Sequence, residues 1–298
     1  MNLLFRTVPL PGGDWTLADT RNGEVFHPRL GAEREAELLY VRPWGLRQAL
    51  AQPSSDPVVV WDIGLGAAGN AAAVLHCWRE VGARPLELWS FDRNRDALAA
   101  AKQFRENHPD SFNWLQDLPP ELFAGVNRFQ MENPEGQTAV WQVVEDDFVG
   151  WAARQPTGSH RPFLAMVDLY SPEASVHEWT LSHWRNIRRS LAEDAATRFV
   201  FHSRSTAVRV TLLLAGFWVG RGPSLGAKEE TTVAALSLDR LSEPLGQAFL
   251  DKVCRSTNSA PFLADGHDRR GPIGESDRVT LLAHPQFNSN RDAAESGR

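Results

Sequence analysis

A glycine-rich turn directly after a buried strand constrains the fold of this chain more than any other feature. Residues 58–70 read VVVWDIGLGAAGN, an apolar, β-branched run that closes at Asp62 and is followed by Gly64, Gly66 and Gly69. A continuous apolar run is typical of a strand buried on both faces of a parallel sheet. Glycines after it let the backbone approach a ligand closely and leave amide groups to face it. The stretch therefore predicts an α/β fold with a ligand-binding loop at the end of a sheet strand.

Strand and helix patterns alternate beyond this loop. The expected strands are residues 58–64, 86–92, 139–147, 163–172 and 197–203, and the expected helices are residues 70–82, 97–107, 148–155, 176–192 and 206–216. Two further β-type runs, residues 217–222 and 231–238, close the series. Five βα units and a final hairpin predict a Rossmann-like α/β fold, with a seven-stranded, mostly parallel sheet and a terminal antiparallel hairpin. Class I methyltransferases typically have this topology, whereas a dehydrogenase more often adds a substrate domain.

Three regions are expected along the chain. Residues 58–238 form the cofactor-binding domain, and residues 1–57 add a small β element and a helix that pack on it. Residues 239–298 are rich in glycine, proline and charge and form a C-terminal extension, whose tail is expected to be disordered.

Composition indicates a cytoplasmic protein without membrane contact. The two cysteines are too few for a disulfide framework, and no run of about 18 apolar residues is present. The net charge of −6 argues against a large nucleic-acid surface. Residues 180–228, however, contain eight basic residues against two acidic ones. That excess fits a phosphate-binding surface and equally a solvated helix face.

Acidic residues close the expected strands. Asp62 ends the first, Asp92 the second, Asp146 and Asp147 the third and Asp168 the fourth. Because ligands of open α/β sheets bind at the carboxyl ends of the strands, these carboxylates are candidate site residues. Asp92 suits the hydroxyls of a ribose, and Asp146 or Asp147 suits an adenine amino group. A helix cap or a surface turn is the structural alternative for each.

Asp168 is the candidate for chemistry, because a carboxylate at this strand end can take a proton from an amine acceptor. Tyr170, beside it, can wall the pocket or stack on a base. The nine histidines show no metal-binding spacing, so no metal is expected, and the motifs of hydrolases and kinases are absent from the sequence.

Asp62 distinguishes between two adenosine-bearing cofactors. The spacing G-x-G-x-x-G is that of dinucleotide loops, but a carboxylate beside the loop repels a pyrophosphate in a cleft of low dielectric constant. S-adenosylmethionine carries an ammonium and a sulfonium, which the same carboxylate attracts. Asp62 therefore favours S-adenosylmethionine over NAD.

Four separated motifs lie in order within residues 24–236. They are FHPRLGAEREAELLYV, DIGLGAAGN, DLYSPEASVHEWT and SRSTAVRVTLLLAGFWVGRGPSLGAKEETTVA. Together they resemble the MnmC-type methyltransferases, which complete 5-methylaminomethyl-2-thiouridine at the wobble position of tRNA. The chain departs from the family at G-A-A-G-N for G-T-G-L-N in the loop, at S-V for N-P in the third motif, and at K-E-E for K-R-E in the fourth.

The resemblance implies a stand-alone methyltransferase domain that uses S-adenosylmethionine and methylates the aminomethyl nitrogen of uridine 34. The residues expected to hold the cofactor are Glu33, Tyr40, Asp62, Gly64, Gly66, Asn70, Asp92, Asp146 and Asp147. Asp168 and Tyr170 are expected at the reacting groups. The expected contacts to the anticodon loop of tRNA are Trp179, Arg204, Arg209 and Lys228.

Two other functions stay open. A methyltransferase of the same fold could act on a small amine or another metabolite, which the acidic net charge and the K-E-E segment favour. A protein that binds the cofactor without turning it over is the second alternative. A dehydrogenase is disfavoured by Asp62 and by the final hairpin.

Overall fold

The computed structural model describes residues 4–11, 13–27, 31–224, 230–263 and 271–288, and the chain divides into two compact units. The first unit consists of Met1–Phe148, Pro162–Leu169 and Pro223–Glu229. The second consists of Val149–Arg161, Tyr170–Gly222 and Glu230–Arg298. This division does not follow the boundaries expected at residues 57 and 238, because the segments on either side of each boundary pack together within one unit.

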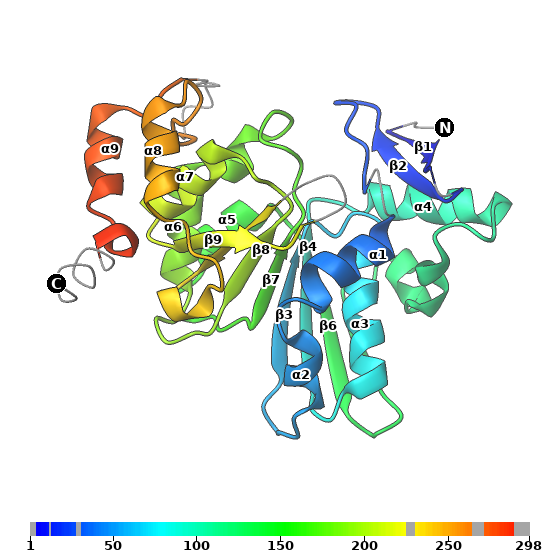
Figure 1. The fold of residues 1–298 in the computed structure, drawn as a ribbon. Helices are drawn as coiled ribbons and strands as arrows, with labels where there is room; N and C mark the ends of the chain where they lie inside the picture. Colours follow the sequence, from blue (N-terminus) through cyan, green and yellow to red (C-terminus); the bar gives the residue numbers. More distant parts are fainter. Residues whose placement is uncertain (1–3, 12, 28–30, 225–229, 264–270, 289–298) are drawn as a thin grey trace. The chain divides into compact units, whose positions relative to one another are not determined.

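A mixed sheet forms the centre of the first unit (Figure 1). Its strands lie in the order β5-β6-β4-β3-β7, with β6, β4, β3 and β7 parallel and β5 antiparallel at the edge. Chain order reverses at β3, which pairs with β4 on one side and β7 on the other. Such a reversal opens a crevice at the carboxyl ends of the strands. The strand bounds are β3 Val58–Ile63, β4 Leu86–Asp92, β5 Arg128–Glu132, β6 Thr138–Glu145 and β7 Leu164–Val167.

Helices connect and cover these strands. The two long ones, α3 (Gly69–Val81) and α4 (Asp96–Asn107), follow β3 and β4 as the periodicity predicts. The shorter elements are α1 Ala32–Ala36, the π-helical turn η1 Glu37–Val41, α2 Leu46–Ala51, and the 3-10 turns η2 Asn113–Asp117 and η3 Pro120–Ala124. In Figure 1, α1 lies beside α3, and their contact is close because position 69 is a glycine. A Cβ at Gly69 would lie 2.5 Å from the Cβ of Ala32.

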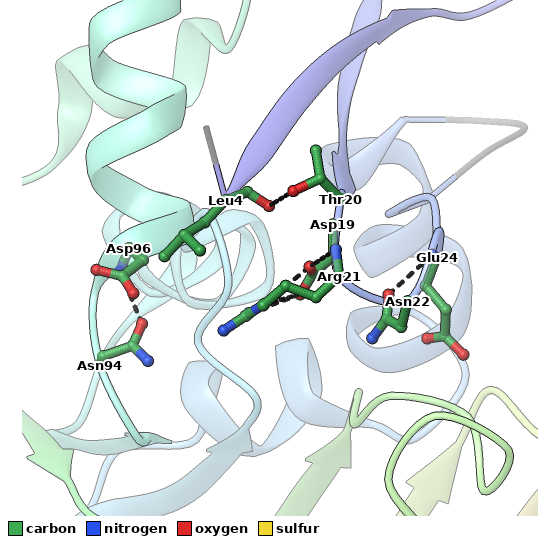
Figure 2. Close-up of polar contacts among 8 residues, drawn as sticks. All are labelled: Leu4, Asp19, Thr20, Arg21, Asn22, Glu24, Asn94 and Asp96. Carbon is green, nitrogen blue, oxygen red and sulfur yellow. Dashed lines mark hydrogen bonds and ion pairs between the residues drawn. The ribbon is translucent and has the colours of Figure 1, made fainter. Parts of the chain in front are cut away.

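An N-terminal hairpin of β1 (Phe5–Pro9) and β2 (Trp15–Asp19) precedes the helices. Figure 2 shows the polar contacts that hold its open end. The buried carboxylate of Asp19 accepts from the guanidinium of Arg21 at 2.6 Å, and the Thr20 hydroxyl donates to the carbonyl of Leu4 at 3.0 Å. These contacts fix the β element that was expected ahead of the sheet. Figure 2 also shows the start of α4, where Asn94 Oδ1 accepts from the amide of Asp96.

The second unit contains three antiparallel strands in the order β8-β10-β9. Their bounds are β8 Arg198–Phe201, β9 Trp218–Gly222 and β10 Thr231–Ala235. Its helices are α5 Phe148–Arg154 (from Val149 onward), α6 Leu181–Ser190, α7 Thr206–Leu214, α8 Gln247–Arg255 and α9 Glu275–Leu282, with 3-10 turns η4 Val176–Trp179 and η5 Leu238–Arg240. Trp184 of α6 packs edge-on against Phe199, Phe201 and Phe217, which form the aromatic core of this unit.

The C-terminal region is integrated into the second unit through a buried glutamine. The side chain of Gln286 accepts from the amide of Val219 at 2.8 Å and donates to the carbonyls of Val219 and Leu245. Gln286 thereby satisfies backbone groups beside β9 that a strand edge otherwise leaves unpaired. The described residues between 239 and 288 therefore contribute to the packing of this unit through Gln286 and through the helices α8 and α9.

The predicted fold class is confirmed. Apart from the β1–β2 hairpin, the described parts of the two units contain five and three sheet strands, against the seven expected. The added strand is β5, whose sequence RFQME alternates in burial and pairs only with β6.

Candidate functional site

The glycine loop passes close to the end of β7. Gly64 has a φ of +102°, and a Cβ there would lie 2.4 Å from the carbonyl oxygen of Asp168. Its amide donates to the carbonyl of Phe91, which ties the loop to β4 as well. Gly66 has a φ of +51°, and its amide donates to Asp92 Oδ2 at 3.0 Å. The loop therefore joins the ends of three neighbouring strands, at the point where their order reverses.

The alanine in the loop stands at a position with left-handed backbone. Ala68 has a φ of +61° and directly precedes α3. The family pattern has its glycine at this position, whereas this chain has Gly69 one residue later. Gly69 lets Ala32 of α1 pack closely against the start of α3, because a side chain at position 69 would clash with it. The departure from the family pattern thus places an alanine at a left-handed position and a glycine at the close contact with α1.

Asp62 is completely buried at the end of β3. Its Oδ2 accepts from the Ser90 hydroxyl at 2.7 Å, and Ser90 in turn accepts from the Trp141 indole at 2.9 Å. Burial raises the pKa of Asp62 to about 8; the Ser90 hydrogen bond opposes this, and the charges of Asp168 and Asp92 add to it. Asp62 Oδ1 has no hydrogen-bond partner among the described residues. A cationic ligand beside this group favours its ionised form.

Asn70 and Asp168 meet on the other side of β3. Asn70 is the second residue of α3, and its Nδ2 donates to Asp168 Oδ2 at 2.9 Å. The buried Oδ1 of Asn70 lacks a partner within the described chain, as does the hydroxyl of Tyr40. Tyr40 lies on the π-helical turn η1, and burial raises its pKa well above the usual value, with the charges of Asp168, Glu35 and Asp62 adding to the effect. The structure thus brings four predicted residues together near the end of β3, namely Tyr40, Asp62, Asn70 and Asp168.

Asp92 and the two acids after β6 lie at the neighbouring strand ends. Burial raises the pKa of Asp92, although the amide of Gly66 donates to its carboxylate. The amide of Asp146 donates to the carbonyl of Asp92 at 2.9 Å, so the predicted ribose and adenine residues are adjacent. Asp147 is half-buried and lies 3.8 Å from the guanidinium of Arg93.

Glu33, which was expected to hold the cofactor, lies away from the other predicted site residues. Glu33 is exposed on α1, and the neighbouring charges that act on it are His76, Asp117 and Asp14. Glu35, two residues later, is buried, and its Oε1 lies 3.2 Å from Nδ1 of His27. The structure therefore does not bring Glu33 to the cluster. The sequence held a signal for Glu35, since it falls three residues after Ala32 and four before Leu39 on the apolar face of one helix.

The second unit contains four of the predicted residues, namely Tyr170, Trp179, Arg204 and Arg209. Trp179 is buried, donates to the carbonyl of Tyr170 and packs near Phe201. Arg209 is 2% exposed, and its guanidinium donates to Glu230, Thr231 and Thr232. A guanidinium held in this way stabilises the second unit and is not offered to a phosphate. Tyr170 is half-buried, Arg204 is exposed, and Lys228 lies outside the described residues.

The strand order, the glycine loop and the acids at the strand ends define the Rossmann-like fold of class I methyltransferases. More particularly, the chain is similar to the MnmC proteins, as its motifs predicted. It is 27% identical over 213 residues to the tRNA 5-methylaminomethyl-2-thiouridine biosynthesis bifunctional protein MnmC of Burkholderia multivorans, covering 68% of this chain. This chain spans only 31% of the length of that relative.

A solved structure shows the same likeness of fold. MNMC2 from Aquifex aeolicus superposes with a TM-score of 0.64 at 22% identity, over 96% of this chain and 85% of that one. Spermidine synthase from Thermotoga maritima has a TM-score of 0.48 at 13% identity, over 93% of this chain and 83% of that one. No protein-family model matches the chain. Within the described residues, no helix is both long and apolar enough to cross a membrane.

Proposed function

We propose that this chain is an S-adenosylmethionine-dependent methyltransferase that methylates the aminomethyl nitrogen of wobble uridine 34 in tRNA. The observation that carries the proposal is the group of buried, unpartnered oxygens of Tyr40, Asp62 and Asn70. A carboxylate oxygen and an amide oxygen are hydrogen-bond acceptors. Buried acceptors are normally satisfied, so their proper partner is a ligand that carries donors and positive charge.

S-adenosylmethionine fits this group, and when bound it supplies a methyl group on a sulfonium. Asp62 and Asn70 would hold its ammonium end, because both present acceptors beside the loop. Asp92 would accept the ribose hydroxyls, and Asp146 with Asp147 would contact the adenine. NAD fits less well, because a pyrophosphate would face the carboxylate of Asp62.

Asp168 performs the proton transfer in this proposal. A protonated amine cannot attack until it loses a proton, and a carboxylate in hydrogen-bond reach can accept it. Because Oδ2 already accepts from Asn70, the proton goes to Oδ1. Asn70 fixes the carboxylate on one side, which helps to align the acceptor nitrogen with the methyl group. Tyr170 is proposed to contact the acceptor base.

The choice of tRNA as acceptor depends on the likeness to MnmC, whose name concerns tRNA modification. Arg204 and Lys228 are the proposed phosphate contacts, together with the arginines of α6. The buried positions of Arg209 and Trp179 favour the second candidate, a methyltransferase for a small amine, because two of the four expected tRNA contacts are interior.

Two experiments test these proposals. Calorimetry with S-adenosylmethionine, its demethylated product and NAD tests the cofactor; we expect the first two to bind, and binding of NAD alone would refute the proposal. Nucleoside mass spectrometry on tRNA from a deletion strain tests the acceptor. We expect loss of 5-methylaminomethyl-2-thiouridine, whereas an unchanged level, with cofactor binding intact, would leave the small amine as the acceptor.

A further inference from the structure

A histidine that no motif singled out lies between two carboxylates at this site. Nδ1 of His27 is 3.2 Å from Glu35 Oε1, and its Nε2 is 3.5 Å from Asp168 Oδ2. The imidazole is nearly buried, and its backbone has a φ of +42°, which residues other than glycine seldom adopt. Three separate segments thus converge here: the loop before α1, α1 itself and the end of β7.

We propose that Glu35, His27 and Asp168 form a carboxylate–imidazole–carboxylate triad in which His27 is the positioning residue for Asp168. This role rests on the methyl transfer proposed above. Asn70 Nδ2 and His27 Nε2 both face Oδ2 of Asp168, so that Oδ1 is presented to the acceptor amine. The Glu35 carboxylate accepts a hydrogen bond from Nδ1 of His27 and so fixes the orientation of the ring. A third group orients the base in the same way in other catalytic sites.

Charge supports the same arrangement. Asp168, Glu35 and Asp62 are the carboxylates that act on His27, from β7, α1 and β3. Burial alone would lower the pKa of His27, but these carboxylates outweigh it and raise the pKa to about 9. At neutral pH both ring nitrogens therefore carry protons and both can donate. An imidazolium here also offsets the repulsion between the buried acids Glu35 and Asp62 and the partly buried Asp168.

The titration of the ring tests the triad independently of any activity. In NMR spectra of the whole protein labelled at histidine nitrogens, we expect His27 to titrate near pH 9. Glu35→Gln removes one carboxylate at nearly constant shape and should lower that midpoint by at least one pH unit. A midpoint near the ordinary value of about 6.5 in the wild type would overturn the triad.

Kinetics test the positioning role. His27→Ala should lower kcat by about 10-fold to 100-fold, the effect of losing a charged partner that orients Asp168, while the dissociation constant of S-adenosylmethionine stays within threefold. Added imidazole should restore part of the rate in this variant. Glu35→Gln should shift the alkaline limb of the kcat profile to lower pH. The matched control is His76→Gln, an exposed histidine on α3, which should behave as the wild type.

The outcomes separate the triad from the proposed function. If wild-type protein binds the cofactor but transfers no methyl group to any amine, the function fails, while the titration still decides the triad. A wild-type kcat in His27→Ala refutes the positioning role, as does a loss of affinity for the cofactor as large as the loss of rate.

Discussion

Asn70 Nδ2 lies 2.9 Å from Asp168 Oδ2, and this hydrogen bond joins two residues that are 98 positions apart in the chain. The contact links the start of α3 to the end of β7 across the carboxyl end of β3. It explains why the asparagine and the aspartate belong to one site, although their motifs are separate in the sequence. It also gives the two residues different expected effects on binding and on catalysis.

We predict that Asp168→Ala abolishes methyl transfer and retains cofactor binding. Loss of a positioned proton acceptor lowers rates by about 10²-fold to 10⁴-fold, whereas the ammonium end of the cofactor is assigned to other residues. Asn70→Ala should weaken both steps, because Asn70 orients Asp168 and also presents an unpartnered oxygen. Single-turnover rates and calorimetry measure the two effects. Normal turnover in Asp168→Ala would remove this residue from the mechanism.

The affinity for S-adenosylmethionine should rise with pH between 6 and 8. Burial raises the pKa of Asp62 to about 8, so the carboxyl is mostly protonated at pH 6 in the unliganded protein. A cationic ligand favours the carboxylate, so binding releases a proton. Below the pKa of Asp62, the affinity should therefore rise by up to about tenfold per pH unit. Calorimetry at several pH values, in buffers of different ionisation enthalpy, measures both quantities.

Asp62→Asn is the control for this pH dependence. The asparagine can still accept from Ser90, but it carries no charge that titrates. Binding should be weaker and nearly constant from pH 6 to 8. A wild-type affinity that does not change over this range would show that Asp62 does not face the charged end of the cofactor.

The two loop residues Ala68 and Gly69 should respond in opposite directions to substitution. Ala68→Gly relieves a left-handed conformation that costs an alanine roughly 1–2 kcal/mol, less the entropy that glycine loses on folding, so a gain of up to about 1 kcal/mol is expected. Gly69→Ala places a Cβ 2.5 Å from that of Ala32 and should destabilise by roughly 1–3 kcal/mol. Urea unfolding measures both; equal losses in the two variants would contradict this account.

Local patterns predicted the elements of the first unit better than they predicted its contacts. The strands at Val58–Ile63 and Leu86–Asp92 and the helices after them were expected within a residue or two, because an apolar run and a glycine stop are local signals. The strand Arg128–Glu132 was missed because an edge strand exposes one face and reads as polar.

Local patterns predicted the site where its residues follow strands, whereas Tyr40 was expected only from the resemblance to the family. Asp62, Asp92 and Asp168 lie at strand ends, which the topology places side by side. His27 and Glu35 come from a loop and a short helix ahead of the sheet, and their meeting with Asp168 depends on the tertiary fold. Arg209 reads as a basic residue in a basic segment, but its face of α7 points into the second unit.

Substitutions of Arg204 and Arg209 separate a nucleic-acid contact from a structural ion pair. Arg209→Met removes a buried guanidinium that donates to the carbonyl of Thr231 and shares Glu230 with Arg221, and loss of these hydrogen bonds should cost roughly 1.5–3 kcal/mol of stability. Arg204→Met should leave stability unchanged and weaken tRNA binding, with a smaller salt dependence. Urea unfolding and tRNA titrations at several salt concentrations test both. Normal stability in Arg209→Met would refute its structural assignment.

Gln286 should contribute more to stability than its position near the end of the chain suggests. Gln286→Ala removes three hydrogen bonds and takes this partner from the amide of Val219 and the carbonyl of Leu245, while the amide of Leu245 still donates to the carbonyl of Val219. At about 1 kcal/mol for each bond, the loss should be about 3 kcal/mol. The matched control is Gln247→Ala on the exposed face of α8, where a change within about 0.5 kcal/mol is expected. Equal effects in the two variants, measured by urea unfolding, would show that the C-terminal region does not stabilise the second unit through this residue.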